Sequence, residues 1–128
     1  MNISNKSIVI VEDDVIAQMT LQHMLSDMGF QDVQCFSDEA SFIKTLQDGN
    51  LPDLILMDVY IKGMRQGISI TQSIQADYNI PIIFITASSD PETLRQLENV
   101  KHHGVLHKPY EYERILESIQ HALESSDQ

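Results

Sequence analysis

The sequence DLILMD at positions 53–58 decides the fold of this chain. Its four apolar residues follow one another with no polar residue between them, which is typical of a strand buried on both faces of a parallel sheet. The runs IVIV at 8–11 and IIFIT at 82–86 have the same character. Together with two shorter runs they predict five strands, at Ser7–Val11, Asp32–Phe36, Asp53–Met57, Pro81–Thr86 and Gly104–His107.

Five segments with helical spacing alternate with these strands. We expect Gly29 to end the first, Ser37-Asp38-Glu39 to open the second, and the third to follow Gly67. The fourth begins at Asp90-Pro91, a capping residue followed by a proline in the first helical position. Apolar stripes mark the first and last helices, with Ala17, Leu21, Met24, Leu25 and Met28 in the first and Tyr112, Ile115, Leu116, Ile119, Ala122 and Leu123 in the last.

This strict alternation predicts an α/β fold in a single domain over residues 1–128. The predicted architecture is a five-stranded, doubly wound parallel sheet with helices on both faces. Ligands of such sheets bind beyond the carboxyl ends of the strands, where the strand order reverses. The residues that follow each strand are therefore the candidates for a functional site.

The chain is acidic, with a net charge of −11 from 19 acidic and 8 basic residues. Direct binding to nucleic acid needs a basic face, and the sequence has no cluster of Lys and Arg. The acidic balance favours cation binding or docking to a basic partner. The N-terminal sequence has no signal-peptide pattern and no run is long enough to span a membrane, so we expect a cytoplasmic protein without a membrane contact. Cys35 is the single cysteine, which excludes an intrachain disulfide, and we expect it to be buried.

The strand ends bring acids, a hydroxyl and a lysine to one edge of the predicted sheet. Glu12 and Asp13 follow the first strand, Asp58 the third, Thr86 ends the fourth and Lys108 follows the fifth. Two carboxylates about 4 Å apart repel by roughly 4 kcal/mol at an effective dielectric near 20. A hard cation such as Mg²⁺ relieves this repulsion, and Lys108 adds a second positive charge. A carboxylate in such a site is a competent nucleophile for a phosphoryl group.

Four short motifs carry a resemblance to a known family. VEDD at 11–14, LMD at 56–58, ITA at 85–87 and HKP at 107–109 occur on successive strands. In this order they resemble the receiver domain of two-component response regulators, over essentially the whole chain. The resemblance implies a flavodoxin-like strand order of 2-1-3-4-5. It also implies a domain that catalyses only its own phosphorylation and dephosphorylation, with the phosphoryl group supplied by a sensor histidine kinase.

The resemblance assigns roles to individual residues. Asp58 is the expected phosphoacceptor, and Glu12, Asp13, Asp58 and the backbone carbonyl of Tyr60 are the expected ligands of Mg²⁺ or Mn²⁺. Thr86 is expected to contact the phosphoryl group and Lys108 to pair with its oxygens. The peptide bond between Lys108 and Pro109 is expected to be cis. The surface of helix four, strand five and helix five is the expected dimerisation or docking face.

Two departures from the family pattern stand out. The loop after Asp58 reads VYIKGMRQG at 59–67, so the glycine that opens the third helix comes one residue late. Many receivers have an aromatic residue where Val105 stands, and its ring turns inward when the threonine moves. Valine has no such ring, and the sequence leaves open whether Tyr110 or helix four conveys activation instead.

Two other functions fit the fold. The chain can be a receiver-like interaction module that signals without phosphate. A hydrolase or nucleotide-binding enzyme is disfavoured, because aspartate-based phosphatases of the haloacid dehalogenase type need an acid where Tyr60 stands, and nucleotide binders need a Gly-rich loop after the first strand.

Several residues have simpler interpretations. Asp14 is expected to cap the first helix and not to bind metal. His102, His103 and His107 lack the spacing and the cysteine partners of a zinc site and are interpreted as surface residues. The methionines are interpreted as core filler, with Met64 the hardest to place.

Overall fold

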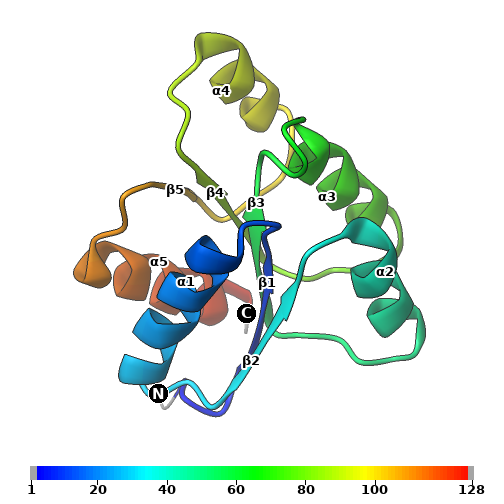
Figure 1. Cartoon of the computed structure of the whole chain (residues 1–128). Coiled ribbons are helices and arrows are strands. Elements are labelled where there is room, and N and C mark those ends of the chain that lie inside the picture. Colours follow the sequence, from blue (N-terminus) through cyan, green and yellow to red (C-terminus); the bar gives the residue numbers. More distant parts are fainter. Residues whose placement is uncertain (1–2, 127–128) are drawn as a thin grey trace.

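The computed structural model describes residues 3–126, in which strands and helices alternate (Figure 1). The strands are β1 (Ser7–Val11), β2 (Asp32–Phe36), β3 (Leu54–Asp58), β4 (Ile82–Thr86) and β5 (Val105–His107). The helices are α1 (Val15–Asp27), α2 (Glu39–Gln47), α3 (Gln66–Asp77), α4 (Pro91–Glu98) and α5 (Tyr112–Ser126).

The five strands form one parallel sheet in the order β2-β1-β3-β4-β5. The chain passes from β1 to β2 on one side and then returns to β3 on the other side, so the strand order reverses at β1. Ile10 accordingly lies between Cys35 of β2 and Leu56 of β3. The predicted α/β class and strand order are confirmed.

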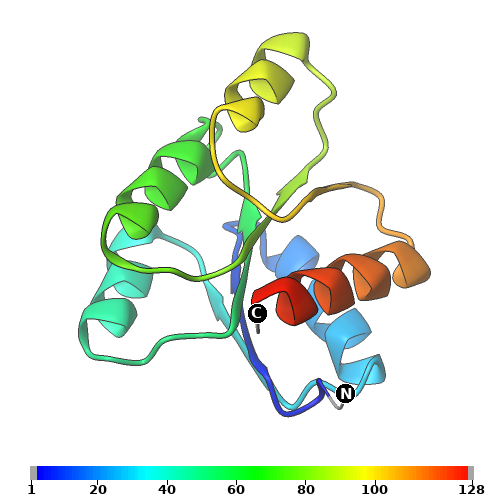
Figure 2. The same cartoon turned by 180° about the vertical axis from the view of Figure 1, so that it is seen from behind.

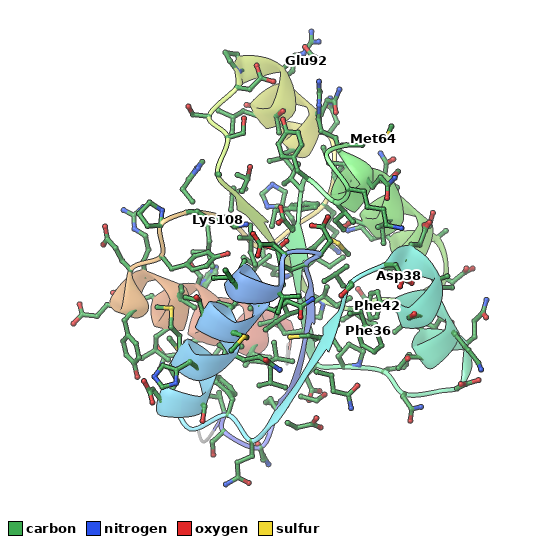
Figure 3. All side chains as sticks on the ribbon, viewed as in Figure 1. Phe36, Asp38, Phe42, Met64, Glu92 and Lys108 are labelled. Atoms are coloured by element: carbon green, nitrogen blue, oxygen red, sulfur yellow. The ribbon has the colours of Figure 1, made fainter. Side chains whose placement is uncertain are left out.

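Helices cover both faces of the sheet (Figures 1 and 2). The even residues of β1, Ile8 and Ile10, pack in a core cluster with residues of α1 and α5. The odd residues, Val9 and Val11, pack in a second cluster with residues of α2, α3 and α4. This alternation explains why the central strands are continuously apolar, since each face of the sheet is covered. Figure 3 labels one contact of the second cluster, in which the rings of Phe36 and Phe42 lie 5.4 Å apart.

Aspartates cap the N-termini of three helices. Asp14 accepts hydrogen bonds from the backbone N–H groups of Ile16 and Ala17 at the start of α1, as predicted. Asp38 and Asp90 do the same for α2 and α4. At the other end of α1, Gly29 has a φ of +99°, a conformation that favours glycine directly after a helix.

Some boundaries and burial predictions were wrong. β3 begins at Leu54 and includes Asp58, because Asp53 uses its backbone and side chain to contact Ser7 instead. β4 and β5 each begin one residue later than predicted, after Pro81, which has no N–H to donate, and after Gly104, whose φ is +144°. Burial was overestimated for residues on outward faces: Met19, Met64 and Tyr112 are exposed, and Cys35 is only half-buried.

Candidate functional site

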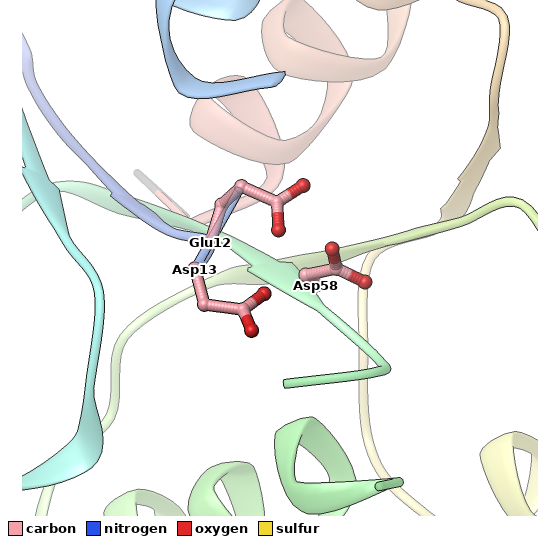
Figure 4. Close-up of side chains that lie close together, drawn as sticks. All are labelled: Glu12, Asp13 and Asp58. Atoms are coloured by element: carbon pink, nitrogen blue, oxygen red, sulfur yellow. The ribbon is translucent and has the colours of Figure 1, made fainter. Parts of the chain in front are cut away.

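Three carboxylates meet at the carboxyl end of the sheet. β1 and β3 are neighbours, with Val11 opposite Met57, so Glu12 and Asp13 after β1 come to lie beside Asp58 at the end of β3. One carboxylate oxygen from each residue lies within 4.8 Å of the others, and Figure 4 shows the three side chains pointing toward a common space. Glu12 is 3% exposed and Asp58 4%. Within residues 3–126 this is the one group of three or more His, Cys, Asp or Glu side chains that could hold a metal ion.

Lys108 brings a positive charge into this cluster. Its Nζ donates to Oε1 of Glu12 at 2.7 Å and to Oδ2 of Asp58 at 3.2 Å. Its backbone N–H donates to the carbonyl oxygen of Thr86 at 2.9 Å, which holds the segment after β5 against the end of β4. The peptide bond from Lys108 to Pro109 is cis, as predicted.

The charges in the cluster are not balanced. Burial raises the pKa of Glu12, and so do the hydrogen bond and the negative charge of Asp58; against the opposing effect of Lys108, these causes together bring the pKa to about 7. Burial alone lowers the pKa of the Lys108 ammonium, but Glu12 and Asp58 outweigh it and hold this pKa above its ordinary value. A single ammonium thus faces three carboxyl groups. Oxygen ligands with excess negative charge are the chemistry that suits a hard divalent cation, so the residues present fit such an ion.

The long loop after β3 folds back as a small hairpin. Ile61 and Met64 exchange two backbone hydrogen bonds, and the two residues between them, Lys62 and Gly63, have φ values of 57° and 75°. Positive φ at both central positions is the geometry of a type I′ turn. The backbone N–H of Lys62 at its tip donates to Oδ2 of Asp13 at 2.8 Å. The extra length of the loop therefore supplies a backbone donor to the acidic cluster.

Tyr60 and Thr86 occupy different places relative to the cluster. The backbone N–H of Tyr60 donates to Oδ1 of Asp58 at 3.0 Å, so its peptide lies at the site. Thr86 is fully buried at the end of β4, and its hydroxyl accepts from the backbone N–H of Ser88 at 2.9 Å. The structure thus brings Glu12, Asp13, Asp58 and Lys108 together, whereas the Thr86 hydroxyl contacts the loop that follows β4.

Two further residues support the site through contacts that the sequence did not indicate. The side-chain amide of Gln18 on α1 donates to the backbone carbonyl of Glu12 and, at 3.0 Å, to the hydroxyl of Ser37. Gly67 packs against β3, and a Cβ atom added to it would lie 1.9 Å from the carbonyl oxygen of Asp58. The late glycine of the loop is therefore required by this close approach, which only the folded structure reveals.

The remaining features add little to the site. Tyr110 is half-buried next to Lys108, and burial raises the pKa of its hydroxyl above its ordinary value. Over the described residues 3–126, none of the helices has the length and apolar character needed to cross a membrane.

Comparison with known proteins places this geometry in a family. A family model, the response regulator receiver domain, matches residues 8–120. The chemotaxis protein CheY-3 of Vibrio cholerae is 27% identical over 118 residues, which cover 90% of this chain and 89% of that protein. The chain spans only 53% to 57% of the length of some longer regulators that it also matches.

Solved structures agree with this assignment. The signal receiver domain of a modulated diguanylate cyclase from Desulfovibrio desulfuricans G20 has a TM-score of 0.86 and 30% identity, with 96% of this chain and 97% of that chain covered. The receiver domain of a sensor histidine kinase from Pseudomonas aeruginosa PAO1, solved with a coordinated magnesium ion, has a TM-score of 0.82 and 24% identity over 94% and 98% of the two chains. With strand order, acidic cluster and family match in agreement, the chain belongs to the response regulator receiver domain family of two-component systems.

Proposed function

We propose that this chain is a phosphorylation switch, in which Asp58 accepts a phosphoryl group from a sensor histidine kinase and the modified form changes its partner binding. The observation that carries the proposal is the Lys108 ammonium, which contacts Glu12 and Asp58, the two buried members of a group of three carboxylates. A lysine held in this place can neutralise charge that arrives on Asp58. A surface cluster of acids without a lysine could not neutralise the charge of an incoming phosphoryl group in this way.

The transfer itself uses the carboxylate of Asp58 as nucleophile. One of its oxygens attacks phosphorus, and the bond from phosphorus to the donor nitrogen breaks with its electron pair leaving on the imidazole of the kinase. Asp58 then carries an acyl phosphate, and attack by water later releases phosphate and restores the carboxylate. Lys108 stays beside the Oδ2 position and pairs with the phosphoryl oxygens.

We assign the metal ligands to Glu12, Asp13, Asp58 and the backbone carbonyl of Tyr60. Mg²⁺ or Mn²⁺ bound there would neutralise charge on the phosphoryl oxygens during an in-line transfer. The three carboxylates within 4.8 Å of one another support this assignment, as does the magnesium ion that the Pseudomonas receiver holds. The backbone N–H of Tyr60 contacts Asp58, so the backbone of this residue lies beside the proposed carboxylate ligands.

Thr86 and the face of α4, β5 and α5 complete the proposal. The Thr86 hydroxyl, which accepts from Ser88, is proposed to exchange this contact for one with a phosphoryl oxygen. Only such differential contacts can shift the protein between two states. The face of α4, β5 and α5 is the proposed surface for a second copy or a target. The alternative function is a receiver-like interaction module that needs no phosphate.

Acetyl phosphate tests the proposal without knowledge of the kinase. In the presence of Mg²⁺, the wild-type chain should gain the mass of one phosphoryl group, and a chelator should prevent this gain. The Asp58→Asn variant should gain nothing. The Asp53→Asn variant is the matched control, because it changes the exposed aspartate at the other end of the same strand, and it should gain one group. If wild type forms no adduct, the interaction module is the better function.

A further inference from the structure

The side chain of Tyr60 connects the acidic site to helix α4. Its backbone N–H donates to Oδ1 of Asp58 at 3.0 Å, and its ring hydroxyl lies 2.6 Å from Oγ1 of Thr93. Thr93 is fully buried in the first turn of α4. One residue of the loop after β3 therefore contacts the phosphoacceptor with its backbone and a neighbouring helix with its side chain.

The donor and the acceptor in the hydrogen bond between Tyr60 and Thr93 can be assigned from the other partner of Thr93. Oγ1 of Thr93 lies 3.0 Å from Oδ2 of Asp90, and a carboxylate can only accept. The single hydroxyl hydrogen of Thr93 is used there, so the hydroxyl of Tyr60 must be the donor to Thr93. The resulting chain runs from Tyr60 through Thr93 to Asp90. It ends on the residue that caps α4, since Asp90 also accepts from the backbone N–H of Thr93 at 3.3 Å.

This hydrogen-bond chain is one of the contacts that hold the start of α4. The helix lies beyond the end of the sheet in both views (Figures 1 and 2), and Thr93 and Leu97 are its buried residues. The loop contributes a second interaction: the pKa of Asp90 lies below its ordinary value, mainly because Thr93 donates to it and to a smaller extent because of the positive charge of Arg65. The same loop thus acts on this helical turn through the hydrogen bond of Tyr60 and, more weakly, through the positive charge of Arg65.

We infer that Tyr60 is a positioning residue that couples Mg²⁺ binding at the acidic site to the placement of α4. This inference deepens the proposed function and rests on it. The hydroxyl chain fixes the ring of Tyr60, and with it the peptide whose carbonyl is the proposed metal ligand. Coupling between two sites is reciprocal, so a change at Thr93 must alter Mg²⁺ binding and Mg²⁺ must alter the first turn of α4. The route needs no aromatic residue at Val105.

Hydroxyl deletions test the inference, because they leave every proposed metal ligand in place. Calorimetric titration should show that Tyr60→Phe and Thr93→Val each bind Mg²⁺ roughly threefold to tenfold more weakly than wild type, as the loss of one neutral hydrogen bond implies. The double variant should bind Mg²⁺ no more weakly than Thr93→Val, because both changes break the bond between Tyr60 and Thr93, and the bond from Thr93 to Asp90 reaches the metal site only through Tyr60. Thr93→Ser keeps the hydroxyl and should restore wild-type affinity.

A matched control comes from α3. Thr71 is also fully buried, and among the described residues its hydroxyl has no hydrogen-bond partner. Thr71→Val should leave Mg²⁺ affinity unchanged, which separates the specific chain from a general effect of losing a buried hydroxyl. Hydrogen exchange supplies a second readout: Mg²⁺ should slow exchange of the first-turn amides of α4 in wild type and Thr93→Ser, and have no effect there in Tyr60→Phe.

The outcomes distinguish this inference from the proposed function. If wild type does not bind Mg²⁺, the proposed function fails and the inference falls with it. If all variants bind Mg²⁺ with wild-type affinity, or if the two single losses add up in the double variant, the inference alone is overturned. An equal loss of affinity in Thr71→Val would also overturn it.

Discussion

The two ends of the sheet hold aspartates in opposite ways. At the amino end, Asp53 is exposed, and its Oδ2 accepts from the backbone N–H of Ser7 at 2.8 Å and from the Ser7 hydroxyl at 3.2 Å. At the carboxyl end, Asp58 is buried with Glu12, and both share the ammonium of Lys108. Neutral donors satisfy the first carboxylate, whereas the second shares one ammonium with a neighbouring carboxylate. The difference separates a carboxylate that supports the fold from those that we propose bind a cation.

The largest effect on stability is expected at the carboxyl end. Gly67→Ala should destabilise the protein by about 3 kcal/mol, because its Cβ would meet the backbone of Asp58 and the start of α3 would have to move. Denaturant unfolding measures this change. Ser73→Ala, an exposed position of the same helix, is the control and should be close to neutral. A neutral Gly67→Ala would show that the end of β3 is not tightly packed.

The pH dependence of stability should reveal the charge at this end. The folded-state pKa of Glu12 is raised from 4.5 to about 7, so its contribution is fully present below pH 4.5 and is lost as the pH rises through 7. Relative to metal-free wild type, Glu12→Gln should therefore become more stable as the pH rises from 4.5 to above 7, by ~3 kcal/mol. Unfolding of both proteins across this pH range measures the difference. Asp53→Asn should show no such gain. If the difference in unfolding free energy between Glu12→Gln and wild type did not change with pH, this explanation would be contradicted.

The amino end should respond more weakly. Asp53→Ala removes the acceptor of two hydrogen bonds from Ser7, and we expect a loss of about 1 kcal/mol because the site is exposed. Thermal unfolding in the presence and absence of Mg²⁺ checks this value. The loss should be the same in both conditions, and a dependence on Mg²⁺ would break the distinction between the two ends.

The smallest effect is expected in the hairpin next to Asp13. Lys62 has a positive φ, which is unfavourable for a residue with a Cβ atom. Lys62→Gly should gain about 0.5 kcal/mol of stability, since relief of this strain exceeds the added backbone freedom of glycine. Denaturant unfolding measures whether the free energy of unfolding rises or falls. A clear loss would mean that the lysine side chain stabilises the loop by another contact.

The sequence predicted the parts of the fold that follow from local pattern. The continuous apolar runs located β1, β3 and β4, and Asp14 and Asp90 gave correct helix starts. Burial was harder to predict at positions such as Tyr112, which fits the apolar stripe of α5 but lies at its exposed first turn. Periodicity identifies a face of a helix, and it does not say how far along the helix the sheet extends.

In the candidate site, too, some features could be predicted from the sequence and others could not. The acidic residues and Lys108 could be expected together, because parallel strands end at one edge. The hairpin at Lys62 and the hydrogen bond from Tyr60 to Thr93 could not, since both depend on the path of an irregular loop. The sequence left open how a chain with Val105 conveys activation, and the contact with α4 offers a route that only the tertiary structure reveals.

The central claim is that the three carboxylates form a site for a divalent cation. Its most direct test is the unfolding free energy of the wild-type chain with and without Mg²⁺ at neutral pH. A ligand that binds only the folded state at 100 times its Kd stabilises by about 2.7 kcal/mol. We predict a gain that rises with Mg²⁺ concentration in wild type and is lost in Asp58→Ala. A wild-type stability that Mg²⁺ does not change would contradict the account.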